Sequence, residues 1–259
     1  MRGWPIIRLV GQRLKAEAMS VPKVSLIATT YNQPVDLDLY LTSLSRQTIA
    51  DFQIVIADDG SDARSQEVVA RHRDVWARER LLHVWHEDSG YRKAMIVNEG
   101  VRQSTGEWLI FTDSDHLVHP RFVEDHLSQR AARTLFMGRR VDLGRGISEW
   151  VRQHPKKIFT REFWLRVLIS GWSSTPSHNP QRALRIANHS LAHFLKLDHV
   201  PNLLGSNFSM DRALFYEVNG FNEENEHYWG EDGDLFARVS HVGATIRGRK
   251  NFAVQLHLW

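Results

Sequence analysis

Two aspartates separated by a single serine, Asp113 and Asp115, directly follow a short apolar run at residues 108–112. If the chain stays extended as it leaves this run, the two carboxylates point to the same side. Carboxylate oxygens suit magnesium and manganese, which usually complete their shells with water and substrate phosphates. A solvated turn could carry the same pair, but the position after an apolar run favours a metal site beside a phosphate-bearing ligand.

Two more acidic pairs could take part in the same chemistry. Asp58 and Asp59 follow the apolar run at residues 52–57, where a carboxylate can accept hydrogen bonds from a nucleoside. Glu231 and Asp232 lie in the run WGEDGD, where one carboxylate could take a proton from an attacking hydroxyl group. Both pairs also have structural interpretations, as a strand-ending turn and as helix caps, which are compatible with the chemical ones.

Short apolar runs alternate with helical patterns over the first half of the chain, and this alternation must position the acidic groups. The expected strands are residues 24–29, 52–57, 81–85 and 108–112, and the expected helices are about 37–44, 62–77 and 94–103. The alternation predicts an α/β fold with a mainly parallel central sheet flanked by helices. Ligands bind at the carboxyl ends of such strands, so Thr30, Tyr31 and Asn32 should meet the aspartates there.

The second half of the chain is less regular. Residues 139–200 are rich in Trp and carry mostly helical patterns, which predicts a helical insertion and not a separately folding unit. Beyond it we expect a helix at about residues 212–218, another from about residue 234, and a final apolar segment at residues 254–257.

The amino-acid composition limits the classes of protein to which this chain can belong. A chain of 259 residues with 42% hydrophobic and 24% charged content can bury a globular core. No apolar run reaches the roughly 18 residues of a membrane span. The absence of cysteine excludes disulfides and thiolate metal sites, so any metal must bind carboxylates or histidines.

The run TTYNQPVD lacks the glycine-rich loop that a nucleotidyltransferase or a nicotinamide oxidoreductase needs.

Positive charge is concentrated in two segments, although the formal net charge is only +3. Residues 1–23 carry five Lys or Arg against one Glu, and residues 139–200 carry eleven against four acidic residues. Both could be solvated basic faces. The first segment also mixes charged and apolar residues as an amphipathic helix at an anionic membrane does, unless translation starts at Met19. Because the predicted site is acidic and no recognition module is present, no nucleic-acid partner is expected.

Four runs occur in a fixed order along the chain: VSLIATTYNQ, ADDGS, GYRKAMIVNEGVRQSTGEWLIFTDSDHLVHP and NFSMDRALFYEVNGFNEENEHYWGEDGDLFARV. Together they resemble the motifs of family 2 glycosyltransferases of the GT-A fold, most closely those of bacterial polymer-forming and galactosyltransferase-like members with a late Trp-Gly-x-Glu-Asp motif. The resemblance covers about residues 24–120 and 202–257, and residues 139–200 do not match. It implies the GT-A fold, a Rossmann-like sheet flanked by helices.

The resemblance implies that ten residues bind the nucleotide sugar. These are Thr30, Tyr31, Asn32, Asp58, Asp59, Arg92, Lys93, Asn98, Asp113 and Ser114. For Asp58 the implied part is support of the turn. For Arg92 and Lys93 it is to offset the charge of the diphosphate, although the pair could also be a loop that is basic by chance.

The resemblance also implies a divalent cation, manganese or magnesium, as cofactor. Asp115 would ligate it most directly, with Asp113 beside it and His257, in the run QLHLW, completing the shell. The cation would stabilise the charge on the departing nucleoside diphosphate. A single histidine near the end of a chain could equally be structural.

On the acceptor side the resemblance implies catalytic parts for Asp232 and Glu231. Asp232 would be the general base, and Glu231 would bind hydroxyl groups of acceptor or donor. Trp229 offers an aromatic face to a sugar ring of the acceptor, unless it belongs to the core.

These features predict a metal-dependent, inverting glycosyltransferase that uses a nucleotide sugar, with a UDP-sugar favoured, and a glycan or lipid-linked glycan as acceptor. The alternative is a non-catalytic scaffold of a glycan assembly complex, which would not hydrolyse a donor. The expected location is cytoplasmic, with peripheral contact at the inner face of the membrane.

The expected organisation is an extension at residues 1–23 followed by one transferase domain at residues 24–259. Within that domain, residues 24–138 would bind the nucleotide sugar, residues 139–200 form the basic insertion, and residues 201–259 form the acceptor and catalytic part.

Overall fold

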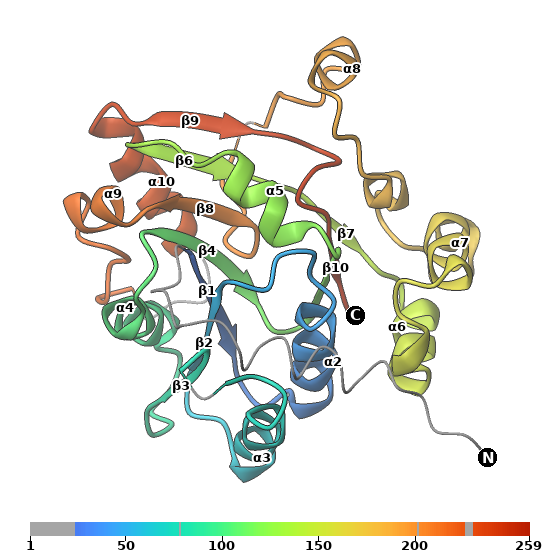
Figure 1. Cartoon of the computed structure of the whole chain (residues 1–259), viewed down its shortest axis with the longest axis horizontal. Coiled ribbons are helices and arrows are strands. Elements are labelled where there is room, and N and C mark those ends of the chain that lie inside the picture. Colours follow the sequence, from blue (N-terminus) through green and yellow to red (C-terminus); the bar gives the residue numbers. More distant parts are fainter. Residues whose placement is uncertain (1–23, 78, 201, 226–229) are drawn as a thin grey trace.

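A seven-stranded sheet forms the centre of the computed structural model, which describes residues 24–259 except 78, 201 and 226–229 (Figure 1). Its strands, in spatial order, are β3 (Leu81–Trp85), β2 (Gln53–Asp58), β1 (Val24–Thr30), β4 (Trp108–Asp113), β8 (Phe208–Asp211), β6 (Thr134–Met137) and β9 (Thr245–Gly248). The first four run parallel, whereas β8 is antiparallel to both of its neighbours and β6 pairs in parallel with β9. The predicted mainly parallel α/β sheet is confirmed.

The register of the central strands places their carboxyl ends side by side. Thr30 of β1 lies opposite Asp58 of β2, and Thr29 lies opposite Asp113 of β4. Because these three strands run in the same direction, the polar residues that follow them meet at one edge of the sheet.

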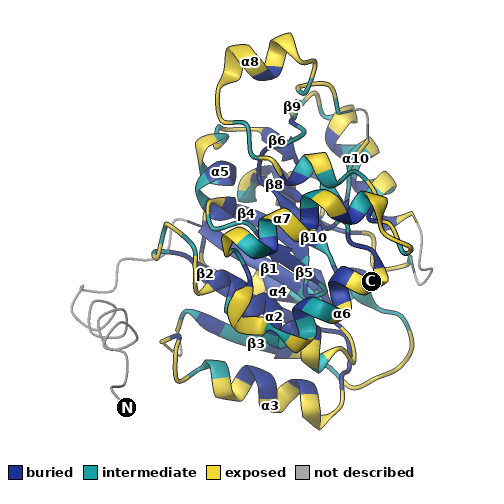
Figure 2. Ribbon diagram, turned by 90° about the vertical axis from the view of Figure 1, so that its right-hand side faces the viewer, coloured by how far each residue is buried: buried dark blue, intermediate teal, exposed yellow. Residues whose placement is uncertain are grey.

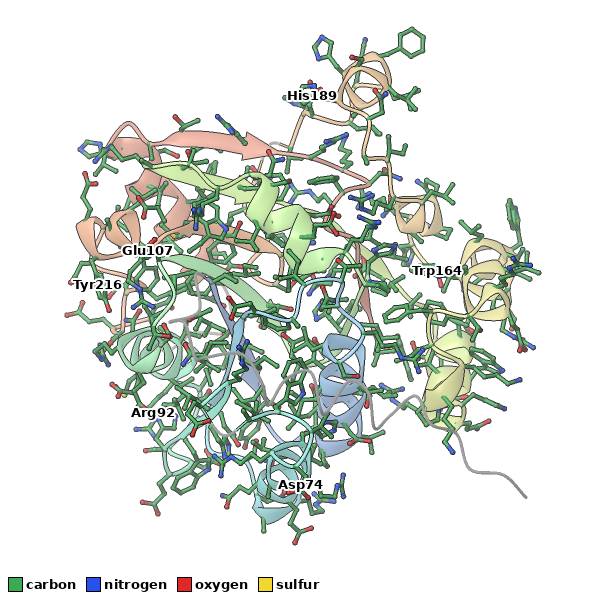
Figure 3. All side chains as sticks on the ribbon, viewed as in Figure 1. Asp74, Arg92, Glu107, Trp164, His189 and Tyr216 are labelled. Atoms are coloured by element: carbon green, nitrogen blue, oxygen red, sulfur yellow. The ribbon has the colours of Figure 1, made fainter. Side chains whose placement is uncertain are left out.

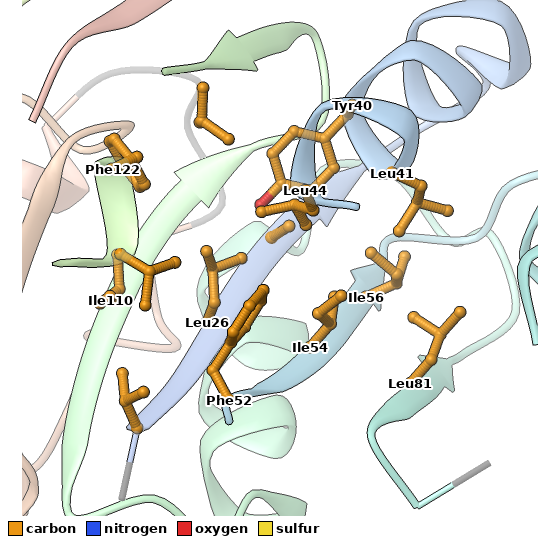
Figure 4. Packing of buried hydrophobic residues seen from close by; sticks show 14 of the residues in the cluster. Leu26, Tyr40, Leu41, Leu44, Phe52, Ile54, Ile56, Leu81, Ile110 and Phe122 are labelled. Atoms are coloured by element: carbon orange, nitrogen blue, oxygen red, sulfur yellow. The ribbon is translucent and has the colours of Figure 1, made fainter. Parts of the chain in front are cut away.

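Helices cover both faces of the central sheet (Figure 1). Outside residues 139–200 they are α2 (Pro34–Leu44), α3 (Ala63–His72), α4 (Lys93–Gln103), α5 (Phe122–Ser128), α9 (Arg212–Glu217) and α10 (Glu231–His241). Alternate strand residues point to opposite faces, so Leu26 of β1 joins the buried cluster under α2 and α3, and Ile27 joins the cluster under α4, α9 and α10. Figure 4 shows Tyr40 and Leu44 of α2 in the same buried cluster as Leu26 and Ile54.

The helix that the sequence extends to about residue 77 is shorter in the structure. Helix α3 ends at His72, and the chain then turns so that Trp76 packs edge-on against Phe52, with ring centroids 5.5 Å apart. Burial of these two aromatic rings favours the turn over further helix.

The helix expected from about residue 234 begins earlier. Helix α10 starts at Glu231, directly after Gly230, whose φ of 113° lies in the left-handed region that favours glycine. Acidic side chains in a first turn are stabilised by the partial positive charge of the helix N-terminus. Glu231 and Asp232 therefore belong to the helix itself.

A second, three-stranded sheet was not predicted. It consists of β5 (His116–Val118), β10 (Gln255–His257) and β7 (Arg140–Asp142), with β10 in the middle, antiparallel to β5 and parallel to β7. The pairing places His257 opposite both His116 and Asp142. This small sheet brings the last described strand back to the end of β4.

The region 139–200 is mostly helical, as predicted, apart from β7 at its start. It contains α6 (Arg145–Gln153), η1 (Pro155–Lys157), α7 (Arg161–Ile169), η2 (Ser170–Trp172), η3 (Pro180–Ala183) and α8 (His189–Phe194). A third buried cluster joins Phe163 and Val167 of α7 to Leu39 of α2 and Leu256 of β10. The insertion therefore shares its core with the rest of the chain. Figure 2 shows α8 projecting from the top of the molecule with most of its surface exposed.

Within the described residues, no helix is both long and apolar enough to cross a membrane. The amphipathic helix predicted in residues 1–23 lies outside the described residues. The division of the chain at residues 138 and 200 stays a prediction.

Candidate functional site

A pocket of about 600 Å³ opens at the carboxyl ends of β1 and β4, between the N-terminal ends of α4 and α10. Ten of the residues singled out from the sequence line it: Thr30, Tyr31, Asp59, Lys93, Asp113, Ser114, Asp115, Glu231, Asp232 and His257. Segments that are far apart in the chain thus meet at one place, the sheet edge predicted from the strand order.

The turn after β2 is built around Asp58, which is fully buried and does not line the pocket. Its Oδ1 accepts a hydrogen bond from the amide of Ser61 at 2.8 Å, and its Oδ2 lies 2.8 Å from Nε2 of His83. Gly60 has a φ of 95°, and a Cβ there would lie 2.6 Å from the Cα of Asp88. Only glycine fits this close approach, so the turn leaves Asp59 at the pocket wall.

Asp59 is held from two sides. The backbone amide of Arg92 donates to its Oδ2 at 3.0 Å, and Nε2 of His86 lies 2.7 Å from its Oδ1. A carboxylate has four lone-pair positions, so further acceptor capacity remains for a ligand in the pocket. Tyr31 stands nearby and donates its hydroxyl to Asp88 at 2.9 Å.

Asn32 joins the loops after β1 and β2 and does not line the pocket. Its backbone amide donates to Oγ of Ser61 at 2.9 Å, and its side-chain oxygen accepts the amide of Asp62 at 2.9 Å. Its φ of 52° is left-handed, a conformation that asparagine tolerates better than most residues. Its part is to hold the two loops together.

Two side chains that the resemblance placed near the donor do not line the pocket. Asn98 is buried and exchanges two hydrogen bonds with the backbone of Phe221, at 2.8 and 2.9 Å. The guanidinium of Arg92 donates to the carbonyl of Glu87, and Figure 3 shows this residue at the outer edge of the molecule. Neither lines the pocket, because each side chain is committed to a backbone group outside it.

Lys93, the first residue of α4, is the basic centre of the pocket. Its Nζ lies 3.2 Å from Oδ1 of Asp113 and 3.8 Å from Oε1 of Glu231. Burial alone would lower the pKa of Lys93, but the charges of Asp113 and Asp232 hold it well above its usual value. The side chain therefore stays a cation. Tyr91 donates its hydroxyl to Glu231 at 3.0 Å and completes this network.

The surroundings of Asp232 shift the pKa of its carboxyl group toward neutrality. The amide of Gly205 donates to its Oδ2 at 2.8 Å, whereas its buried Oδ1 makes no hydrogen bond within the described structure. Burial raises the pKa of Asp232 to about 6, although Lys93 lowers it. A carboxylate with a pKa near neutrality can accept a proton and release it again.

Of the two aspartates in the Asp-Ser-Asp run, Asp113 lies at the end of a strand and Asp115 lies in the turn that follows it. Asp113 ends β4, and the chain then turns at Ser114 and Asp115, so the extended backbone assumed from the sequence is wrong. The amide of Ser114 donates to the carbonyl of Thr29 at 2.8 Å. Asp113 accepts a hydrogen bond from the Thr29 hydroxyl and pairs with Lys93.

Asp115 lies instead in a cluster with two histidines. The potential metal-binding atoms of Asp115, His116 and His257 all lie within 4.8 Å of one another. Nε2 of His257 is 3.2 Å from Asp115, and its Nδ1 is 3.3 Å from Asp142. Burial alone would lower the pKa of His257, but these two carboxylates raise it to about 9. Asp113 is not a member of this cluster.

The residues present fit a divalent cation. Five carboxylates line the pocket, against the fixed positive charges of Lys93 and Arg140 and the titratable His257. Nε2 of His116 is buried and makes no hydrogen bond within the described residues, and Nδ1 of the same ring lies 2.5 Å from Oδ1 of Asp115. An excess of negative charge and unsatisfied donor atoms at one place are what a cation would satisfy.

Sequence reasoning missed several lining residues. Tyr91 adjoins Arg92, which was singled out, so its neighbour was a usable signal. Gly205, Ser206 and Arg140 carried no local signal, because only the tertiary fold brings them to the pocket. Trp229, predicted to contact the acceptor, lies outside the described residues.

The chain matches the family model described as glycosyl transferase family 2 over residues 25–218. Residues 185–257 match a second model, described as the N-terminal domain of galactosyltransferase. A validoxylamine A glucosyltransferase of Streptomyces hygroscopicus subsp. jinggangensis (strain 5008) is 32% identical over 226 residues, which span 85% of this chain and 51% of that protein. A chondroitin synthase of Escherichia coli is 23% identical over 229 residues, spanning 86% and 33%. The chain therefore spans about half or less of these relatives.

Two solved structures share the fold. The mannosyltransferase PcManGT from Pyrobaculum calidifontis, in complex with GDP-Man and Mn2+, has a TM-score of 0.60 at 16% identity and covers 98% of this chain and 63% of its own. The S. aureus TarS 1–349 structure has a TM-score of 0.56 at 19% identity, covering 91% and 60%. At such identities the likeness concerns the fold alone, and it agrees with the GT-A arrangement predicted from the sequence.

Proposed function

This chain belongs to glycosyl transferase family 2, and we propose from this premise that it moves a sugar from a nucleotide-sugar donor to a hydroxyl group of an acceptor, aided by a divalent cation. The observation that carries the proposal is that Asp115 and His257, two members of the possible metal-binding cluster, line the same pocket as the carboxylate of Asp232. A metal-dependent inverting transferase uses both features, since one supports the leaving group and the other activates the attacking hydroxyl.

Asp232 is the proposed general base. In the step we envisage, its Oδ1 takes the proton of the acceptor hydroxyl while the acceptor oxygen bonds to the anomeric carbon. The bond from that carbon to the diphosphate oxygen breaks, and its electron pair leaves with the diphosphate. Attack opposite the leaving group makes the transfer inverting. Glu231, held by Tyr91 and close to Lys93, would bind hydroxyl groups of donor or acceptor.

The departing diphosphate is the proposed partner of Lys93. The permanent charge of this side chain and the free backbone amides at the start of α4 both favour an anion there. A bound divalent cation would supply further stabilisation of the developing negative charge. Asp115 and His257 would hold it, with Asp113 close to Lys93 on the same wall.

Nucleoside binding is proposed for Thr30, Tyr31 and Asp59, which line one side of the pocket. A UDP-sugar is the proposed donor, because a carboxylate such as Asp59 can accept a hydrogen bond from a uracil ring N–H or a ribose hydroxyl. Asn32 and Asp58 would act through the loops that they hold. No donor contact is proposed for Arg92 or Asn98.

The proposed acceptor is a glycan or lipid-linked glycan presented at an anionic membrane surface. Residues 139–200 support this, since they carry the excess of basic residues together with large exposed apolar side chains. Trp172 is 87% exposed and Phe194 is 80% exposed. Figure 3 shows His189 at the base of the projecting helix α8 and Trp164 on α7. We propose that this insertion forms the acceptor side of a domain whose residues 24–138 bind the donor and whose residues 201–259 complete the catalytic part.

The test is release of nucleoside diphosphate from a panel of nucleotide sugars, with manganese and with chelator. Asp115→Ala is compared with Asp74→Ala, which removes an exposed carboxylate outside the pocket. Turnover of one donor that needs both the cation and Asp115, and is unaffected by Asp74→Ala, supports the proposal. Absence of turnover and of metal-dependent donor binding would instead favour a non-catalytic scaffold.

A further inference from the structure

His116 is a fully buried histidine whose Nε2 makes no hydrogen bond within the described structure. It begins β5, immediately after Asp115, and pairs with His257 of β10. Buried polar groups are almost always satisfied, so a buried imidazole with one unpaired nitrogen, beside a carboxylate of a possible metal-binding cluster, is what a bound ion would explain. His126 is equally buried and its Nε2 is also unpaired, but its Nδ1 lies 2.9 Å from the Ser209 hydroxyl and not from a carboxylate.

The surroundings of His116 resemble one side of a metal shell. Its Nδ1 lies 2.5 Å from Oδ1 of Asp115, within ion-pair distance. On the other side of the carboxylate, Oδ2 is 3.2 Å from Nε2 of His257. Donor atoms about 2.1 Å from one ion are separated by about 3 Å when adjacent and about 4.2 Å when opposite. The atoms of this cluster lie within 4.8 Å of one another, and the shortest separation is 2.5 Å, so the side chains would shift slightly to surround an ion.

The second nitrogen of His257 is also accounted for. Its Nδ1 lies 3.3 Å from Asp142, which in turn accepts a hydrogen bond from Nε of Arg140 at 2.7 Å. Metal-binding histidines commonly donate their other N–H to a carboxylate, which fixes the ring and directs the free nitrogen toward the ion. The rings of His116 and His257 stack at 4.7 Å between centroids, so each restrains the other.

We propose that His116 is a direct ligand of the divalent cation, so that the protein supplies two imidazoles and one carboxylate from His116, His257 and Asp115. This inference rests on the proposed function and makes it more specific. Three protein donors form a site before any nucleotide binds and leave positions open for diphosphate oxygens and water. Imidazole nitrogen suits first-row transition metals, whereas magnesium prefers oxygen. Such a site would favour a transition metal over magnesium.

The first test is a manganese titration of the nucleotide-free protein, followed by pulsed electron paramagnetic resonance with 14N and 15N histidine. Couplings to two imidazole nitrogens are expected in the wild type. Coupling to one or none, or no binding without nucleotide, overturns the proposal. This readout needs no variant, so it cannot be confounded by misfolding.

The second test compares His116→Gln with His126→Gln, which changes another buried histidine outside the pocket. His116→Gln should weaken manganese binding by at least about tenfold and leave one nitrogen coupling, while His126→Gln should keep both. Unchanged affinity in His116→Gln overturns the proposal. If two nitrogen couplings are seen but no sugar is transferred, the metal site is supported and the transferase function is refuted. If sugar transfer depends on the metal but only one nitrogen couples, the transferase function is supported and the part of His116 is refuted.

Discussion

The backbone amide of Gly205 donates a hydrogen bond to Oδ2 of Asp232 at 2.8 Å, across 27 positions of the chain. The two residues are packed so closely that a Cβ at Gly205 would lie 2.1 Å from Oδ1 of Asp232. The glycine therefore both orients the carboxylate and leaves room for it.

Gly205→Ala should displace this carboxylate and lower kcat by about a hundredfold, the scale of a lost general base. The matched control is Gly233→Ala, because a Cβ at Gly233 meets nothing within 4 Å. Transfer rates and melting temperatures of both variants check the prediction. If Gly205→Ala keeps the wild-type kcat, the catalytic part of Asp232 does not depend on the carboxylate position that Gly205 sets.

Asp232→Asn removes the base while keeping the shape of the side chain. We expect kcat to fall by about a hundredfold to ten-thousandfold, with donor affinity nearly unchanged. Asp234→Asn is the control, since Asp234 lies in the same helix turn but pairs with Arg238 and does not line the pocket. Equal losses in the two variants would point to helix destabilisation and remove Asp232 from the catalytic step.

The pH dependence of kcat/KM should follow the carboxyl of Asp232, whose pKa is about 6. The base works only when deprotonated, so activity should be full above that pKa and fall as the pH drops through it. Lys93 lowers this pKa, and Lys93→Met should therefore move the acidic limb to higher pH. A pH profile that is the same in both proteins would contradict the assignment of the base.

Lys93 and Arg92 should differ in their effect on donor binding, although they are neighbours in the sequence. Lys93 lines the pocket and Arg92 does not, so Lys93→Met should weaken nucleotide-sugar binding by about tenfold or more. Arg92→Met should leave it within about twofold of the wild type. Calorimetric titration with a nucleoside diphosphate measures both, and the opposite order would place the diphosphate elsewhere.

Exposed apolar side chains of the insertion should take part in membrane contact. Trp172→Ser combined with Phe194→Ser should reduce cosedimentation with anionic phospholipid vesicles by about tenfold, since both side chains are open to a bilayer surface. Val75→Ser changes an exposed apolar residue on α3's side of the molecule and should have no effect. Binding that survives the double change would argue against this surface.

Local sequence patterns were sufficient for the central strands and for the acidic groups that follow them. Buried parallel strands read as continuous apolar runs, and the polar residue after each run marks its carboxyl end, so Asp59 and Asp113 could be placed at one edge of the sheet. Helix α10 starts earlier than the apolar spacing predicted. The left-handed conformation of Gly230 and the helix dipole determine that boundary more strongly than the spacing does.

The rest depended on contacts between distant parts of the chain. Strands of three residues such as β5 and β10 have too little pattern to be recognised, yet their pairing places His257 beside Asp115 and His116. The same holds for Gly205, which meets Asp232 only in the folded chain. The sequence by itself determined the α/β sheet and which acidic residues stand at its edge, because those are properties of short apolar and polar patterns. The tertiary structure alone decided which side chains share the pocket, because that depends on long-range pairing and packing.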